Sequence, residues 1–313
     1  MATENQRDTL PPRGTASATT SRCPACITPG KYWHTLNNTR IDRCCACGHG
    51  YVWPRPSRIL TNQFYISLKL DGALDHHDYR RRRSSGQHEP ELVARHLARL
   101  GKSGGNLLDV GAGEGRFTHW FMDHGFTVTP LEINPGLATR LVTATGRNVI
   151  TEPFELWSPE GGKTFDVIVI SQVLEHVPDA GLWLDHATSL LARNGVLFVS
   201  VPSFESLLVR AIGWREGNIN PPTHLNFFTD RSLTHLATAR GLTSVFRHTP
   251  NILPAAAAMD AAAGALPRLP RALGLATGLV AWGGLSLAAP IGMGRFLHAY
   301  FTRDAGSPPT DTA

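Results

Sequence analysis

A chain of 313 residues is long enough for one large domain or two smaller ones with a sizeable core. Its hydrophobic content of 42% is ordinary for a globular protein. The formal charge of +5 is uneven, since residues 22–105 carry 14 basic and 6 acidic side chains whereas residues 106–250 carry 10 and 14. A basic first part favours an anionic partner: a nucleotide-linked substrate, an acidic carrier protein, a membrane surface or nucleic acid. A merely solvated surface is an equal alternative.

The N-terminal residues 1–21 are polar and rich in Thr, Ser and Pro. They lack the apolar run of a secretory signal, so we expect a disordered tail on a cytoplasmic protein, with peripheral attachment to a membrane as an alternative. A second disordered tail is expected at 304–313.

All five cysteines lie between positions 23 and 47. Two C-x-x-C pairs with seventeen residues between them have the spacing of a zinc site, and they predict a small zinc ribbon at 22–56. Cys45 is left over, and His34 and His49 are alternative ligands. A closed site of this kind stabilises its module and performs no chemistry. The predicted ligands of Zn²⁺ are Cys23, Cys26, Cys44 and Cys47.

The stretch from 107 onward predicts a strand, a loop and a helix. Residues 107–110 are a short buried run, and Gly111, Gly113 and Gly115 follow at alternate positions. Glycine lets the backbone turn sharply and lets a ligand approach it, and the N–H groups of the next helix face that ligand. A dinucleotide site would need G-x-G-x-x-G, but its third glycine would fall on Arg116.

An acidic residue stands where a second strand should end. Glu132 follows the strand-like run 126–131, nineteen residues after Gly113. A carboxylate at this strand end can accept hydrogen bonds from both hydroxyls of a ribose. Pro130 departs from the pattern because proline removes a donor from the sheet.

Residues 108–115 together with Glu132 resemble the first motif and the ribose-binding acid of class I S-adenosylmethionine-dependent methyltransferases. A glycine-rich turn without a ligand is the alternative for the loop alone. The resemblance implies an α/β fold of the Rossmann-like, doubly wound kind. Its sheet should have seven mostly parallel strands, of which the last is antiparallel. This domain should span residues 106–303 and follow the zinc ribbon. The resemblance also implies S-adenosyl-L-methionine as the cofactor.

A third element points to the same edge of the sheet. Residues 165–171 form a continuous β-branched strand, and residues 171–179 resemble the fourth-strand motif of small-molecule methyltransferases. Ligands of open parallel sheets bind at the carboxyl ends of strands, so the three elements should meet. The expected cofactor contacts are Asp109, Gly111, Ala112, Gly113, Glu132, Ile133, Glu155, Ser171 and Gln172.

An oxygen or acidic carbon that accepts a methyl group must also lose its proton, and histidine is the usual agent. His176 lies in the fourth-strand motif. His224 precedes a Phe-Phe-Thr run that is similar to one before the last helix of these enzymes. Either histidine is a candidate base, and Glu175 is a base or a scaffold. The alternative for each histidine is ordinary packing.

Residues 44–56 resemble the zinc ribbon of bacterial methyltransferases that act in sugar, quinone or secondary-metabolite biosynthesis. The resemblance predicts O- or C-methylation of a small polar or anionic intermediate. A nucleic-acid-binding zinc protein with a vestigial domain is the alternative, although no base-reading helix follows the ribbon. Residues 57–105 are expected to be a linker, in which Tyr65 and Tyr79 line the pocket or pack, followed by a helix from Pro90.

Residues 272–294 carry no charge and are long enough to span a bilayer. However, residues 296–302 look like a final strand antiparallel to 242–248, and a crossing would separate the two strands. We therefore expect a helical insertion at 252–294, packed on the domain or against a second copy in a homodimer. A membrane-associated lipid methyltransferase is the alternative.

Overall fold

The computed structural model describes residues 20–67, 89–250 and 279–303, the last range without 281–282, 285 and 288. The expectations for Tyr79, for most of the insertion at 252–294, for residues 1–19 and for the tail at 304–313 lie outside the described residues.

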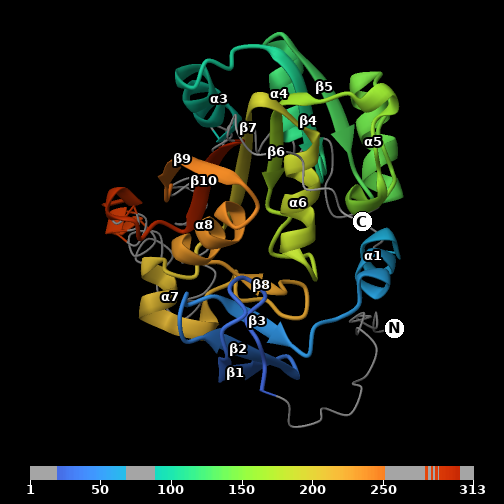
Figure 1. The fold of residues 1–313 in the computed structure, drawn as a ribbon. Coiled ribbons are helices and arrows are strands. Elements are labelled where there is room, and N and C mark those ends of the chain that lie inside the picture. The colour runs from blue at the N-terminus through green and yellow to red at the C-terminus, as the bar shows by residue number, and fades with distance from the viewer. Residues whose placement is uncertain are drawn as a thin grey trace, which may run out of the picture.

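The larger sheet has the strand order β5-β4-β6-β7-β10-β9 (Figure 1). Strands β5, β4, β6 and β7 are parallel, and β10 runs antiparallel to both of its neighbours. This arrangement confirms the predicted α/β class with an antiparallel last strand. The strands are β4 (Gly105–Val110), β5 (Phe126–Leu131), β6 (Phe165–Ser171), β7 (Leu191–Pro202), β9 (Leu242–His248) and β10 (Phe296–Arg303).

A short strand was also expected at residues 148–150, between those at 126–131 and 165–171, and it is reduced to a single bridge between Leu131 and Ile150. The large sheet therefore has six described strands rather than seven. Ile150 N donates to Pro130 O at 3.0 Å, and Glu132 N donates to Ile150 O at 2.9 Å. The N and O atoms of one strand residue face the same neighbouring strand. The nitrogen of Pro130, which carries no hydrogen, therefore faces the short segment at Ile150 rather than β4. The proline therefore costs no hydrogen bond to β4, and the chain leaves β5 undistorted at Glu132.

Helices cover both faces of the large sheet. Leu107 of β4 packs with α3 and α4, whereas its neighbour Leu108 packs on the opposite face with α6 and α8. Asn134 caps α5 by accepting a hydrogen bond from Leu137 N, and Thr229 opens α8 in a capping box. The helices are α3 (Glu89–Arg99), α4 (Arg116–Asp123), α5 (Pro135–Thr145), α6 (Ala180–Leu190) and α8 (Asp230–Thr238).

Two further helices lie outside the elements expected from the sequence. Helix α1 (Arg58–Ser67) occupies the start of the predicted linker, and Ser57 Oγ accepts a hydrogen bond from Leu60 N at its first turn. Helix α7 (Leu207–Ile212) lies in the long connection after β7. In Figure 1, α1 stands below α5, apart from the helices that cover the sheet.

The cysteine-rich region is a small antiparallel sheet with the order β1-β2-β3-β8. Its first three strands are β1 (Gly30–Leu36), β2 (Thr39–Cys44) and β3 (Gly50–Trp53), and β8 (Asn226–Phe227) comes from the far end of the chain. Gly50 pairs with Phe227 and Tyr51 pairs with Asn226. The predicted ribbon at 22–56 thus completes its sheet with a segment that the sequence assigned to the methyltransferase domain (Figure 1).

Within the described ranges, no helix combines the length and the apolar character needed to cross a membrane.

Candidate functional site

The glycine loop after β4 has one open position between two tightly packed ones. Gly111, Gly113 and Gly115 all have positive φ, at 69°, 57° and 80°. A Cβ on Gly111 would lie 2.6 Å from Val173 Cγ2, and one on Gly115 would overlap Leu141 Cδ1. At Gly113 the nearest atom would be the carbonyl oxygen of Gly111, at 4.0 Å. The outer glycines are required by packing, whereas the middle one leaves room for a ligand.

The acid at the end of β5 faces this open glycine. Glu132 is 6% exposed, and its Oε2 accepts a hydrogen bond of 2.8 Å from Gly113 N. Its Oε1 accepts another of 2.8 Å from Asn134 N. Burial raises the pKa of Glu132, and the two N–H groups oppose that rise. Each carboxylate oxygen can accept a second hydrogen bond, so the group fits a pair of ribose hydroxyls.

Asp109, also expected at the cofactor, faces the interior of the domain. Its Oδ2 accepts a hydrogen bond of 2.6 Å from Thr118 Oγ1, which ties β4 to α4. Burial raises the pKa of Asp109 to about 6. In this structure, Asp109 therefore fixes the base of the glycine loop rather than its open side.

The end of β6 supplies polar groups to the same edge. Ser171 Oγ is buried and has no hydrogen-bond partner in the described part of the chain. Gln172 adopts a left-handed conformation with φ of 58°, and its Nε2 donates to Ser200 Oγ at 3.0 Å. Ala112 lies within the glycine loop, between Gly111 and Gly113, and Ile133 directly follows Glu132, so both expected residues stand at this edge.

Helix α1 connects three parts of the predicted site. Asn62 Nδ2 donates to Glu155 Oε1 at 3.0 Å, and Asn134 Nδ2 donates to Tyr65 O at 2.9 Å. The hydroxyl of Tyr65 lies 2.8 Å from His176 Nδ1. The other oxygen of Glu155 is buried without a partner among the described residues. Sequence reasoning missed Asn62 and Asn134, although Asn134 stands directly before a proline in a typical helix-capping pattern.

The three predicted catalytic residues lie together. The imidazole rings of His176 and His224 meet edge to face with centroids 4.6 Å apart. His176 Nε2 lies 3.8 Å from Glu175 Oε1. These side chains come from two loops, one after β6 and one before β8, that are distant in sequence.

This cluster disfavours positive charge. Burial lowers the pKa of His176 to about 3, with His224 contributing, and burial also lowers the pKa of His224. Burial raises the pKa of Glu175 to about 8. The imidazoles are therefore neutral at physiological pH and offer lone pairs, and the carboxylate of Glu175 is the stronger base once it is ionised.

Arg55, at the end of the ribbon, holds the two catalytic loops together. Its guanidinium donates to Pro178 O at 3.1 Å, to Leu225 O at 2.7 Å and to Asn226 Oδ1 at 2.8 Å. The amide of Asn226 in turn donates to Leu174 O at 2.9 Å. Sequence reasoning missed both residues because their partners are mostly backbone carbonyls, which leave no sequence pattern.

The sulfurs of the two C-x-x-C pairs converge. Their ligand atoms all lie within 4.8 Å of one another, and the cysteines are free of disulfides. A tetrahedral zinc site with Zn–S of about 2.3 Å needs sulfurs about 3.8 Å apart, so the set fits. The closest pairs are Cys23–Cys47 at 3.6 Å, Cys26–Cys44 at 3.4 Å and Cys26–Cys47 at 3.4 Å.

The histidine alternatives for this metal site are wrong. His49 is buried with Nδ1 3.2 Å from Ser232 Oγ, and His34 stacks on Trp214. Cys45 is exposed and does not belong to the cluster.

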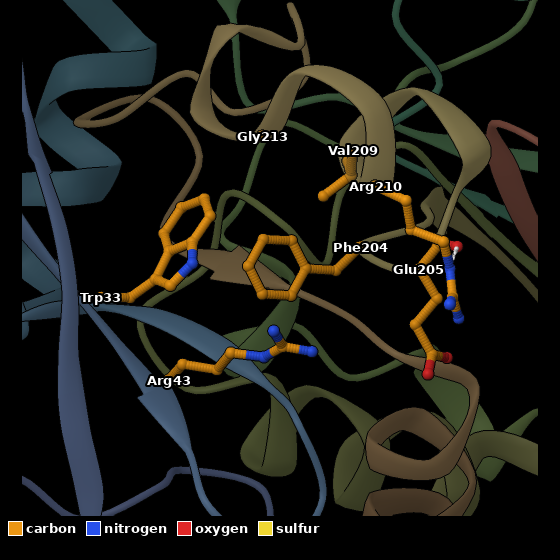
Figure 2. A pocket seen from close by; sticks show the side chains of 7 residues that line it. All are labelled: Trp33, Arg43, Phe204, Glu205, Val209, Arg210 and Gly213. Carbon is orange, nitrogen blue, oxygen red and sulfur yellow. Dashed lines mark hydrogen bonds between the residues drawn. The ribbon is translucent and has the colours of Figure 1, made fainter.

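A separate pocket of about 330 Å³ lies between the ribbon and α7 (Figure 2). Trp33 and Arg43 face it from the ribbon strands, and Phe204 stands between them and α7. It contains none of the residues predicted for cofactor binding or catalysis. Its lining consists of Trp33, Arg43, Phe204, Glu205, Val209, Arg210 and Gly213.

Comparison with known proteins agrees with this geometry. The family described as "Methyltransferase domain" matches residues 79–245, more than half of the chain, and the chain belongs to this family. The fold and the glycine–carboxylate edge are those predicted for its class I, S-adenosylmethionine-dependent members.

Two similar proteins are ubiquinone biosynthesis O-methyltransferases. The one from Paramagnetospirillum magneticum is 35% identical over 96 residues, which cover 29% of this chain and 37% of that protein. The one from Caulobacter vibrioides is 33% identical over 108 residues, which cover 33% and 43%. The chain thus matches less than half the length of these curated relatives.

Two solved structures share the fold. A putative sarcosine dimethylglycine methyltransferase from Galdieria sulphuraria superimposes with a TM-score of 0.51 and 17% identity, covering 69% of this chain and 85% of that one. Magnesium protoporphyrin IX methyltransferase from Synechocystis PCC 6803, solved with bound SAH, also gives 0.51, with 13% identity and coverage of 79% and 100%.

Proposed function

We propose that this chain transfers a methyl group from S-adenosylmethionine to a small, polar or anionic biosynthetic intermediate. The observation that carries the proposal is the hydrogen bond from Gly113 N to Glu132 Oε2, at the glycine of this loop whose Cβ position is open. A carboxylate for the ribose and an accessible backbone for the rest of the nucleoside meet there. When bound, S-adenosylmethionine supplies a methyl group already activated by its sulfonium.

The acceptor belongs at the cluster of Glu175, His176 and His224. Asn134 and Tyr65 connect the edge at Glu132 to this cluster through hydrogen bonds of 2.9 and 2.8 Å, so the two sites adjoin. The cluster holds two partly buried neutral imidazoles and the buried carboxyl of Glu175, and one of these groups takes the acceptor's proton.

An oxygen acceptor is favoured over a carbon acceptor. The curated relatives are named O-methyltransferases, and the segment they share with this chain is about 100 residues long. The shared segment covers less than half of these relatives, so quinone precursors, sugar nucleotides and other hydroxylated metabolites all belong in the test.

We also propose that the four clustered cysteines hold structural zinc. The sulfur spacing fits a closed tetrahedral site, which performs no chemistry but stabilises the ribbon. The ribbon acts on the reaction through Arg55, which reaches the catalytic loops.

Transfer of a labelled methyl group tests the proposal. The full chain is incubated with methyl-labelled S-adenosylmethionine and fractions of a small-molecule extract, and labelled products are identified by mass spectrometry. We expect a labelled small molecule with the natural chain and a loss of about tenfold or more with Glu132→Ala. Label that appears only on macromolecules, or equal labelling by both proteins, would contradict the proposal.

A further inference from the structure

We infer that Glu175, His176 and His224 form a second metal site, which binds a divalent transition-metal cation and leaves coordination positions open for the methyl acceptor. One ligand atom of each side chain can be chosen so that the three lie within 4.8 Å of one another. Zinc with nitrogen and oxygen ligands at about 2.0–2.2 Å needs them about 3.3 Å apart, so a small closure of the side chains completes the site.

The histidines have the outer contacts of metal ligands. His176 Nδ1 lies 3.0 Å from Thr223 O, and His224 Nδ1 lies 2.8 Å from Asn218 O. A carbonyl oxygen only accepts, so the tautomer that satisfies Thr223 O and Asn218 O carries its proton on Nδ1. The hydroxyl of Tyr65, 2.8 Å from His176 Nδ1, is free in this tautomer to donate to Thr223 O at 3.3 Å. Each Nε2 is left with its lone pair, and backbone carbonyls are the outer partners that orient histidines at metal sites.

The carboxylate has an unfilled acceptor. Glu175 is 1% exposed, and its Oε2 has no hydrogen-bond partner within the described ranges. A buried polar atom without a partner costs free energy that a bound cation would recover.

The backbone already joins the two loops that carry the ligands. The carbonyl of Glu175 accepts hydrogen bonds from Leu225 N at 2.6 Å and from Asn226 N at 3.0 Å. His224 N donates to Asn220 O at 2.9 Å. The ligands are therefore held in place before any cation binds, which reduces the ordering that binding requires.

The ligand atoms determine which cations this site prefers, and they differ from those of the cysteine cluster. Two imidazoles and one carboxylate suit Zn²⁺, Fe²⁺, Co²⁺ or Mn²⁺, whereas four thiolates suit zinc in a closed site. Three protein ligands leave positions for oxygen atoms from outside the protein.

The consequence for the reaction rests on the proposed function. A hydroxyl of the acceptor bound to the cation would lose its proton to water more readily. The freed oxygen lone pair then forms the bond to the methyl carbon while the carbon–sulfur bond breaks, and S-adenosylhomocysteine leaves with that electron pair. In this form of the reaction the histidines are ligands rather than bases.

Zinc stoichiometry tests the site without any turnover. The full chain is loaded with Zn²⁺, desalted and analysed for metal, and we expect about two zinc ions per chain. Glu175→Gln and His224→Ala should each retain about one, and Cys26→Ser should also retain about one, at the other site. The control His235→Ala changes an exposed histidine of α8 and should retain about two. Thermal unfolding shows which variants are folded, and Glu175→Gln is the least disruptive of them.

A natural chain that holds only about one zinc ion, or a folded Glu175→Gln that still holds two, would overturn the inference. Titration with Co²⁺ gives an independent reading, because Co²⁺ at the histidine–carboxylate site lacks the thiolate absorption of the cysteine site. Binding of S-adenosylmethionine is measured on the same samples. Loss of that binding with two metals retained would defeat the proposed function and leave this inference standing.

Discussion

Arg55 Nη2 donates to Asn226 Oδ1 at 2.8 Å, and this bond joins the end of the cysteine-rich ribbon to the loop that carries His224. Asn226 also donates to Leu174 O and Val177 O, on either side of the other two catalytic residues. One guanidinium and one amide therefore set the spacing of the two catalytic loops. The ribbon therefore helps to position the residues of the candidate site through Arg55.

Replacement of Arg55 should impair catalysis more than cofactor binding. Arg55→Lys removes the planar fork and leaves several carbonyl acceptors unpaired, so we expect an unfolding free energy lower by about 2 kcal/mol. The rate of methyl transfer should fall, while the Kd for S-adenosylmethionine changes little. Arg58→Lys alters an exposed arginine of α1 and is the control. Equal rates for the two variants would show that the ribbon does not set the loop spacing.

The glycines of the loop should separate folding from binding. Gly115→Ala places a Cβ against Leu141, so we expect a loss of about 2 kcal/mol or more in stability. Gly113→Ala meets open space and should cost about 1 kcal/mol, from its left-handed backbone alone. Its affinity for S-adenosylmethionine should nevertheless fall about tenfold or more, because the methyl group fills the ligand's space. Thermal unfolding and calorimetry measure both, and a Gly113→Ala that binds normally would contradict this assignment.

The cysteines should differ in their effect on metal and stability. Cys26→Ser removes one of four converging sulfurs, and we expect the loss of about one zinc ion per chain and a lower unfolding temperature. Cys45→Ser changes an exposed cysteine outside the cluster and should alter neither. Metal analysis beside thermal unfolding gives the comparison. Zinc loss from Cys45→Ser would place the ligands differently.

Asp109 should make stability depend on pH in a known direction. Its pKa of about 6 in the folded chain lies above the value of about 3.9 expected when unfolded. Between these values the folded chain keeps a proton that the unfolded chain has lost, so the free energy of unfolding falls as pH rises through this window. The full effect is on the order of 2–3 kcal/mol and is complete above about pH 6.

Asp109→Asn cannot ionise and keeps an oxygen acceptor for Thr118. Its stability relative to the natural chain should therefore rise between about pH 5 and pH 7.5, as measured by denaturant unfolding. If the free energies of unfolding of the two proteins differ by the same amount at both pH values, burial does not raise the pKa of Asp109.

The sequence predicted the elements that carry strong local patterns. The bounds of β5 and β6 agree with the expected runs, because each is a buried apolar run with turn residues after it. Gly113, Glu132 and the cluster at His176 converge because the carboxyl ends of parallel strands share one edge. Sequence spacing alone was enough for these.

Features that depend on tertiary contacts could not be predicted in the same way. Helix α1 is weakly patterned, and it is held by Asn62 on Glu155 and Tyr65 on His176. Strand β8 is only two residues long and exists because β3 lies beside it. The short strand expected at residues 148–150 has only Val149 and Ile150 as apolar residues and forms a single bridge. Such elements are stabilised by contacts with neighbouring elements rather than by the propensity of their own residues.

Equilibrium binding of S-adenosylmethionine, measured by titration calorimetry on the full chain, tests the central claim most directly. We expect one-site binding by the natural chain and by Glu152→Gln, which changes an exposed acid just beyond the bridge at Ile150. Glu132→Gln should weaken binding by about tenfold or more, because the carboxylate accepts from both ribose hydroxyls and an amide cannot. Absence of binding by the folded natural chain, or equal affinity for both variants, would contradict the account.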